Sequence, residues 1–383
     1  MRSFKACLAT SLLIISASAL LAHRFPKEVI HHPQPNEGLS QRFEWALKEA
    51  EKRAYKGSFW VGYSIRRLMG ENSYIGSFDC LRKAEDISLQ DIISGRKAAS
   101  PDIPDYEKMR RAIQEALEQV DKPSKPEKMV WKEVAILFNY GKSKPGVLEK
   151  VEMSNLSLSF DSDGLPLIWL GGAEDAQSID LLRNLYGEMT SSKTKEGIIA
   201  AAGIHGNPNI VIPFLEKVLK SNDDDSLRQN AAFWLGQQND EAALKILVQT
   251  AKIDHSLSVR KESVFALSQI ELEEAVDALI DLARSAEDTK VRREAIFWLG
   301  QEASIKAEAA LENFAYKESD SEIQEQAVFA LSELPNEEGL DSLIKIAKTH
   351  PNIHVRKKAV FWLGESKNPK ALNALIEIIK GKL

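Results

Sequence analysis

The chain has 383 residues, of which 44% are apolar and 28% are charged, and its formal net charge is −6. This length exceeds what one ordinary hydrophobic core holds, so we expect two or more domains. From residue 194 onward the chain carries 23 Lys and Arg against 30 Asp and Glu, and before it 27 against 26. Neither part has the basic surplus that phosphate backbones select, which argues against nucleic-acid binding.

Residues 1–22 have the pattern of a signal peptide. Arg2 and Lys5 provide a positive start, an apolar stretch follows, and Ala17-Ser18-Ala19 fits the small-x-small cleavage pattern. The stretch is shorter than the ~20 apolar residues of a membrane span. An uncleaved anchor is the alternative. We therefore expect export to the periplasm or the cell exterior, with no membrane span after removal of the signal.

The next part of the chain predicts a small domain. Residues 23–36 contain Pro and His and are expected to form a flexible arm. Residues 37–172 mix helical and strand-like patterns, which predicts a small α+β domain. Its expected helices span 39–56 and 106–120, and its expected strands span 59–65, 132–140, 147–160 and 165–170. Asp163-Gly164 predicts a hairpin turn between the last two strands. Residues 173–193 are expected to hold a bridging or capping helix.

The cysteines and histidines of the sequence do not form a recognisable metal or cofactor site. Cys80 is the only cysteine after the expected signal, which excludes an internal disulfide and a cysteine metal cluster. A buried apolar role for Cys80 is the simpler interpretation, and a reactive thiol is the alternative. His23, His31 and His32 lack further ligands at suitable spacing, and residues 161–164 lack the later acidic ligand of a calcium loop. We expect neither a metal nor a cofactor.

The C-terminal part is built from a repeat of 32 residues. An apolar stretch around a phenylalanine recurs at this spacing five times, and a degenerate copy at 200–204 precedes the five. A Trp/Gly form of the stretch alternates with an Ala/Ser form, which adds a second period of 64. We therefore divide residues 194–383 into six units. The repeated phenylalanines are Phe233, Phe265, Phe297, Phe329 and Phe361.

Each unit predicts a pair of helices. The first helix begins near an apolar-Arg pair, such as Val259-Arg260, and closes at the Gly or Ser after the aromatic stretch. The second helix carries a leucine at a fixed place, with apolar partners three and four residues later. A single helical hairpin of this size cannot bury enough surface, so neighbouring hairpins must cover one another. The fixed leucines are Leu215, Leu247, Leu279, Leu311, Leu343 and Leu375.

With its Val-Arg pairs, its small residues at Ala295 and Ala359 and its fixed leucines, this half resembles the HEAT-repeat family, in particular the short bacterial repeats of phycobilin-lyase-like proteins. The resemblance implies an α-solenoid that binds proteins. It does not carry over lyase activity, because no matching bilin-handling residues are present. The His-Glu pairs with which other members bind iron are also missing from the sequence.

Two regular rows of polar residues are candidate sites. The arginines at the start of the first helices fit a structural ladder, in which each pairs with a turn carboxylate of a neighbouring unit; a ligand-binding row is the alternative. They are Arg228, Arg260, Arg292 and Arg356. A second row lies near the ends of the second helices, where the helix dipole favours cations. It also fits a basic row that holds an acidic protein or peptide. It comprises Lys220, Lys252, Arg284, Tyr316, Lys348 and Lys380.

Trp234, Trp298 and Trp362 stand in alternate units, with alanine between them. Large residues opposite small ones predict interlocking layers, whereas exposed tryptophans would be binding anchors. No nucleophile, phosphate-loop or zinc-protease motif is present. His205 stands where other units carry Gln237 or Gln301, which indicates a structural turn residue.

These observations favour an exported binding scaffold that is not an enzyme and that holds a protein or peptide in the groove of the repeats. The alternative is an enzyme whose catalytic site lies in the α+β domain, with the repeats presenting its substrate. A polar pocket near Trp60 and Trp169 with a convergent acid–base pair would favour that alternative. A spacer that assembles end to end is a third possibility.

Overall fold

A computed structural model describes residues 25–34, 36–55, 58–76, 88–95, 128–141, 146–221 and 223–381. The expected signal peptide, the expected helix at 106–120 and Cys80 lie outside these ranges. The chain divides into two compact units, one ending at Phe214 and the other beginning at Leu215. Each unit is described by itself.

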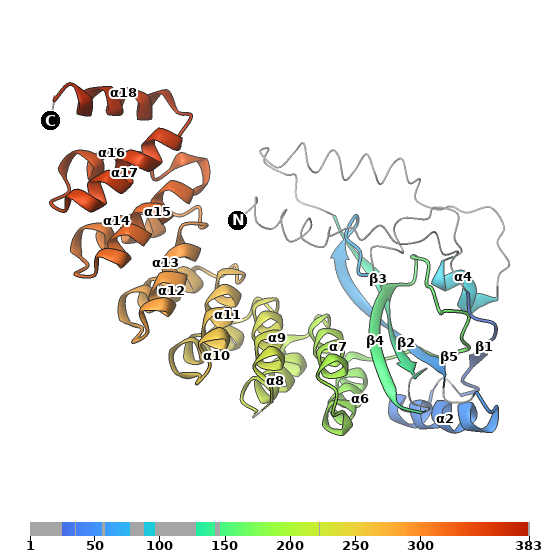
Figure 1. The fold of residues 1–383 in the computed structure, drawn as a ribbon. Helices are drawn as coiled ribbons and strands as arrows, with labels where there is room; N and C mark the ends of the chain where they lie inside the picture. Colours follow the sequence, from blue (N-terminus) through green and yellow to red (C-terminus); the bar gives the residue numbers. More distant parts are fainter. Residues whose placement is uncertain are drawn as a thin grey trace. The chain divides into compact units, whose positions relative to one another are not determined.

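The first unit is organised around a five-stranded sheet (Figure 1). The order of the strands is β1-β5-β2-β3-β4. β2 pairs with β3, and β3 with β4, in antiparallel fashion, whereas β5 is parallel to both β1 and β2. The strands are β1 (Val29–His31), β2 (Phe59–Gly70), β3 (Met129–Tyr140), β4 (Leu148–Asn155) and β5 (Leu167–Gly172).

Both faces of this sheet are covered. On one face, α2 (Leu39–Lys52) places Phe43 edge-on to Phe138 of β3, with ring centroids 5.2 Å apart. Alternate residues of a strand point to opposite faces, so the neighbours of these residues point the other way. The opposite face holds an apolar cluster that includes residues of α4 (Leu89–Ser94). Its members include Trp60, Leu89, Ile93, Leu137, Phe160 and Trp169.

Two expectations about this unit were wrong. The expected arm at 23–36 contains β1, which pairs with β5, and His32 beyond it is buried edge-on to Trp45. Three residues are too few to show a strand period in sequence. The turn at Asp163-Gly164 does have positive φ angles, but β4 and β5 do not pair. A turn signal is local and does not determine which strands become neighbours.

The helices that follow form successive hairpins, which confirms the fold class expected from the repeat. Side chains that accept a backbone N–H begin many of them, for example Asp240, Asp288 and Asp320. The helices are α6 (Asp175–Glu188), α7 (Ser192–Gly203), α8 (Pro208–Leu219), α9 (Asp225–Gly236), α10 (Glu241–Ile253), α11 (Leu257–Ser268), α12 (Glu273–Ser285), α13 (Thr289–Leu299), α14 (Ile305–Lys317), α15 (Ser321–Glu333), α16 (Leu340–Thr349), α17 (Ile353–Glu365) and α18 (Pro369–Ile379), with a 3-10 turn η1 (Pro335–Glu337) before α16.

In the second unit the helices form two layers. The first helices of the repeats, α9, α11, α13, α15 and α17, pack directly on one another, and the second helices, α10, α12, α14, α16 and α18, form the other layer (Figure 1). The fixed leucines Leu247, Leu279, Leu311 and Leu343 are buried between the layers. No helix among the described residues is both long and apolar enough to cross a membrane.

Candidate interaction face of the repeats

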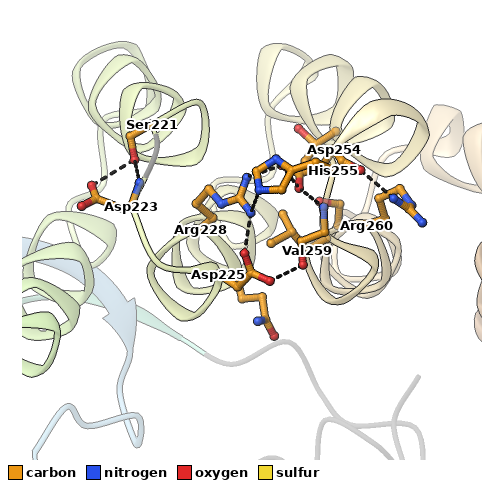
Figure 2. A network of polar contacts seen from close by, with 12 residues as sticks. Ser221, Asp223, Asp225, Arg228, Asp254, His255, Val259 and Arg260 are labelled. Carbon is orange, nitrogen blue, oxygen red and sulfur yellow. Dashed lines mark hydrogen bonds and ion pairs between the residues drawn. The ribbon is translucent and has the colours of Figure 1, made fainter.

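The arginine row lies between successive repeats. Arg228 of α9 is only 2% exposed, and its Nη2 donates to Asp225 at 2.6 Å. Its Nη1 donates at 3.0 Å to Asp254, which precedes the next first helix, α11 (Figure 2). The guanidinium also lies 2.9 Å from Nε2 of His255. Arg228 is therefore positioned to join two repeats and is too buried to meet a large partner.

The same connection recurs along the stack. Arg260 donates to Asp288 at 2.7 Å, and Arg292 pairs with Glu318 at 2.6 Å. In each case the carboxylate belongs to the turn before the next repeat. Arg356 instead donates to the carbonyl of His350 at 2.5 Å. This geometry is that of a structural ladder.

The basic row of the second helices is largely engaged within the protein. Lys252 pairs with Asp281 at 2.8 Å and Lys348 with Glu377 at 2.6 Å, in each case across to the following second helix. Lys220 pairs with Glu216 one turn earlier, at 2.5 Å. The hydroxyl of Tyr316 is bound to Thr349 at 2.8 Å, and Arg284 and Lys380 are exposed. These pairs reduce the charge that the row offers to an acidic partner.

A continuous series of aromatic side chains runs along the first helices. We call it the aromatic ribbon. Along this series, a contact between two rings of one helix alternates with a contact between rings of successive first helices. The centroids of contacting rings are 4.8–6.3 Å apart. Such contacts contribute about 0.5–1.5 kcal/mol each beyond the burial of area. In order of contact the ribbon comprises Trp234, Phe233, Phe265, Trp298, Phe297, Phe329, Trp362 and Phe361.

Two kinds of interface alternate along the ribbon. Where a glycine faces an alanine of the next repeat, as Gly236 faces Ala266, the two phenylalanines stack in nearly parallel planes. At the other interfaces a tryptophan fills the space, as Trp298 does against Phe265. This alternation explains the 64-residue period of the sequence.

Most of the ribbon is partly exposed to solvent. Trp298 is buried at 7% exposure, but the other members are at least partly exposed, and Phe361 reaches 55%. The tryptophans therefore do not fit a single role. Trp298 interlocks the layers, whereas Trp234 and Trp362 contribute partly exposed rings to the same surface.

A row of polar residues borders the ribbon, three residues before each phenylalanine. It contains Asn230, Glu262 and Glu294 on α9, α11 and α13. Glu294 accepts from Nε1 of Trp298 at 3.2 Å and pairs with Lys261 at 2.7 Å. Burial, and then the charge of Glu294, raises the pKa of Glu262. Oδ1 of Asn230 is buried without a hydrogen-bond partner, a state that costs about 1–3 kcal/mol.

The first unit contains a buried polar chain. The hydroxyl of Tyr63 lies 2.7 Å from Oγ of Ser178, which lies 2.8 Å from Nε2 of His205. Nδ1 of His205 faces the carbonyl of Ala202 at 3.1 Å. Burial lowers the pKa of His205 to about 4 and raises that of Tyr63. All three side chains are buried, so no substrate can reach them in this conformation.

The acid–base pocket that would have favoured an enzyme is not formed by the two tryptophans. Trp60 and Trp169 are buried in the apolar cluster of the sheet, and the indole N–H of Trp60 donates to the carbonyl of Ser162. Among the described residues, no group of three potential ligands could hold a metal ion.

The second unit consists of stacked helical hairpins and is therefore a helical-repeat domain. A model of HEAT repeats matches residues 212–300, 277–349 and 308–382. Residues 212–382 therefore carry HEAT repeats, which confirms the resemblance drawn from the Val-Arg pairs and the fixed leucines.

Other comparisons concern curated proteins and solved structures. No curated protein matches the sequence. Human deoxyhypusine hydroxylase in complex with glycerol is 20% identical, with a TM-score of 0.24 over 54% of this chain and 78% of that one. The complex of CpcE and CpcF of phycocyanin lyase from Nostoc sp. PCC7120 is also 20% identical, with a TM-score of 0.30 over 53% and 80%. We draw nothing about activity from either.

The sequence predicted the positions that recur in each repeat but not the surface that they form. The phenylalanines were assigned a structural role, and the polar row before them was not singled out. A signal was present, since the position three before each phenylalanine holds a polar residue in all five units. The sequence does not show the close approach of the first helices, which brings these recurring positions of successive repeats into contact.

Proposed function

We propose that the protein is a binding scaffold, without catalytic activity of its own, that holds a protein or peptide segment against the aromatic ribbon. The observation that carries this proposal is the unbroken contact of eight aromatic side chains across five first helices, most of them partly exposed. Exposed contiguous apolar surface is typical of interaction sites, and aromatic residues dominate their binding energy.

The ladder supports this role because it makes the surface rigid. Buried Arg228 and the pairs of Arg260 and Arg292 fix each first helix relative to the next. A rigid surface loses little conformational freedom when a partner binds, which favours affinity. The basic row of the second helices, with Lys252 and Lys348 already paired, is the weaker candidate for a docking surface.

The test compares capture by the wild-type chain with capture by two double variants. Phe265→Gln with Phe329→Gln removes two partly exposed rings from the ribbon. The matched control is Ile253→Gln with Ile305→Gln, which removes apolar side chains that are 68% and 86% exposed on the second-helix layer. We expect a protein captured from an extract by the wild type to be lost only with the first variant. Equal capture by both variants would place the interaction elsewhere.

We further propose that the scaffold works outside the cytoplasm, after cleavage near residues 17–22. The support is the positive, apolar and small-residue order of the N-terminus. Expression of the full chain in a bacterium, fractionation and mass measurement of the product test this. A product that keeps Met1 and stays with the cytoplasmic fraction would contradict export.

A further inference from the structure

The polar row beside the aromatic ribbon holds acceptors that the protein itself does not use. Glu262 lies on α11 one turn before Phe265, is half-buried, and makes no hydrogen bond or ion pair within the part of the chain that the structure describes. Neighbouring Glu294 is different, because Lys261 and Trp298 both donate to it. Glu262 is thus a carboxylate at the edge of an aromatic surface with no cation of its own.

Asn230 provides a second, independent acceptor. It occupies the equivalent position one repeat earlier, three residues before Phe233, and its Oδ1 is buried without a partner. Since α9 and α11 pack directly on one another, these two positions lie on neighbouring helices. Two side-chain acceptors without a donor among the described residues, the carboxylate of Glu262 and the buried Oδ1 of Asn230, therefore lie at one end of the ribbon.

The rings at this end favour a flat cation. Phe233 and Phe265 stack at 6.3 Å, and Phe265 meets Trp298 at 4.8 Å. Aromatic faces attract cations, and a guanidinium adds planar stacking and several N–H donors to its charge. An ammonium group is compact and strongly hydrated, so it gains less from such a surface.

We propose that Glu262 and the neighbouring rings, beside Asn230, form a recognition site for an arginine side chain of an extended protein segment held on the ribbon. This inference rests on the proposed scaffold function and names the chemistry of its partner. The site belongs to one end of the ribbon, because the equivalent positions in the last two repeats are Gln326 and Lys358. The partner is therefore directional, with arginine over α9 to α13 and apolar residues over α15 and α17.

Nearby cations do not fill the site. Lys261 is paired with Glu294, and Arg293 is paired with Glu322 of the next repeat at 3.0 Å. These two carboxylates, Glu294 and Glu322, both belong to repeats that follow the repeat of Glu262. The charge next to the ribbon at this point is therefore that of Glu262 itself.

The test uses the full chain and a pair of labelled ten-residue peptides of alternating leucine and arginine or leucine and citrulline. Citrulline keeps the shape of arginine but has no charge. Fluorescence anisotropy should give an affinity for the arginine peptide at least about tenfold higher, the equivalent of about 1.4 kcal/mol. Glu262→Gln should abolish this preference. Glu274→Gln, which changes the net charge equally at an exposed position of α12, should preserve it.

The outcomes separate this inference from the scaffold function. Phe265→Gln should weaken the binding of both peptides, because it acts on the ribbon itself. If it does so while Glu262→Gln leaves the preference for arginine unchanged, the scaffold stands and the arginine site is wrong. Equal affinity for the two peptides, or binding of neither at millimolar concentration, also overturns the arginine site. Thermal melting verifies that each variant is folded.

Discussion

Gly236 lies so close to Ala266 that a Cβ atom added to the glycine would stand 2.5 Å from the alanine carbonyl oxygen. The same relationship joins Gly300 to Ala330, at 2.7 Å. In both pairs a helix end of one repeat rests on the backbone of the next. These contacts set the separation at which Phe233 can stack on Phe265.

The first prediction concerns this contact. Gly236→Ala should destabilise the second unit by about 1–3 kcal/mol, because the obstructing atom is backbone and overpacking forces the helices apart. Gly364→Ala is the matched control, since nothing lies within 4 Å of its Cβ position. Alanine favours a helix over glycine, so the control should be neutral or stabilised by up to about 1 kcal/mol. Urea unfolding followed by circular dichroism measures both, and equal stability of the two variants contradicts the contact.

A second prediction concerns Arg228. Arg228→Ala leaves the carboxylate of Asp254, which is 9% exposed, without its ion-pair partner. Breaking a buried pair in this way costs about 3–5 kcal/mol. Arg293→Ala breaks an exposed pair with Glu322, which contributes about 1 kcal/mol or less.

Hydrogen exchange locates the effect of Arg228→Ala. Because repeats contact only their neighbours, protection should fall mainly in α9 to α11 and less in α15 to α18. Uniform loss of protection over the whole second unit would show that the repeats unfold as one block. A stability equal to that of Arg293→Ala would mean that the buried pair contributes no more than a surface pair.

The repeat could be predicted from sequence because its signals are local. Apolar residues at helical spacing, caps such as Asp288 and the fixed leucines each act within one hairpin or its neighbour. The sheet was harder, because the pairing of Val29–His31 with β5 joins residues far apart in the chain. A polar pocket beside Trp60 and Trp169 was the feature that would favour an enzyme, but strand alternation and the packing of α4 place both tryptophans in a core.

The candidate site could be predicted only in part from the sequence, for a similar reason. The half-burial of Glu262 and the buried Oδ1 of Asn230 arise from the closeness of adjacent first helices, which Gly236 and Ala266 permit. Sequence spacing gives the register of such residues but not the distance between helices. Arg228, Arg260 and Arg292, by contrast, could be paired with turn carboxylates from the 32-residue register alone.

A third prediction concerns pH. Burial lowers the pKa of His205 in the folded protein to about 4, from about 6.5 when unfolded. The unfolded chain therefore takes up the proton first on acidification. The stability that neutral His205 contributes is fully present above about pH 6.5 and is lost as the pH falls toward 4. Between pH 7 and pH 5 the loss from this residue should be about 2 kcal/mol.

The variant His205→Gln isolates this contribution. Glutamine stands at the equivalent position of later repeats, as Gln237 and Gln301 do, and it offers polar atoms to Ser178 without titrating. Urea unfolding at pH 7 and pH 5 should show a smaller loss of stability for His205→Gln than for the wild type. The control His354→Gln, at an exposed position, should follow the wild type. A variant that loses as much stability as the wild type would exclude His205 as the source.

The fourth prediction separates the two roles of the tryptophans. Trp298 is buried against Phe265 and Glu294, so Trp298→Ala should leave a cavity and cost about 3–5 kcal/mol. Trp234 is half-exposed at one end of the ribbon, and its ring is in contact with that of Phe233. Its replacement by alanine should cost less than half as much while weakening the capture of a partner. Urea unfolding measures the stabilities, and the capture assay measures binding. If Trp234→Ala destabilised the protein as much as Trp298→Ala, the exposed end of the ribbon would be part of the core and its role in binding would have to be reassigned.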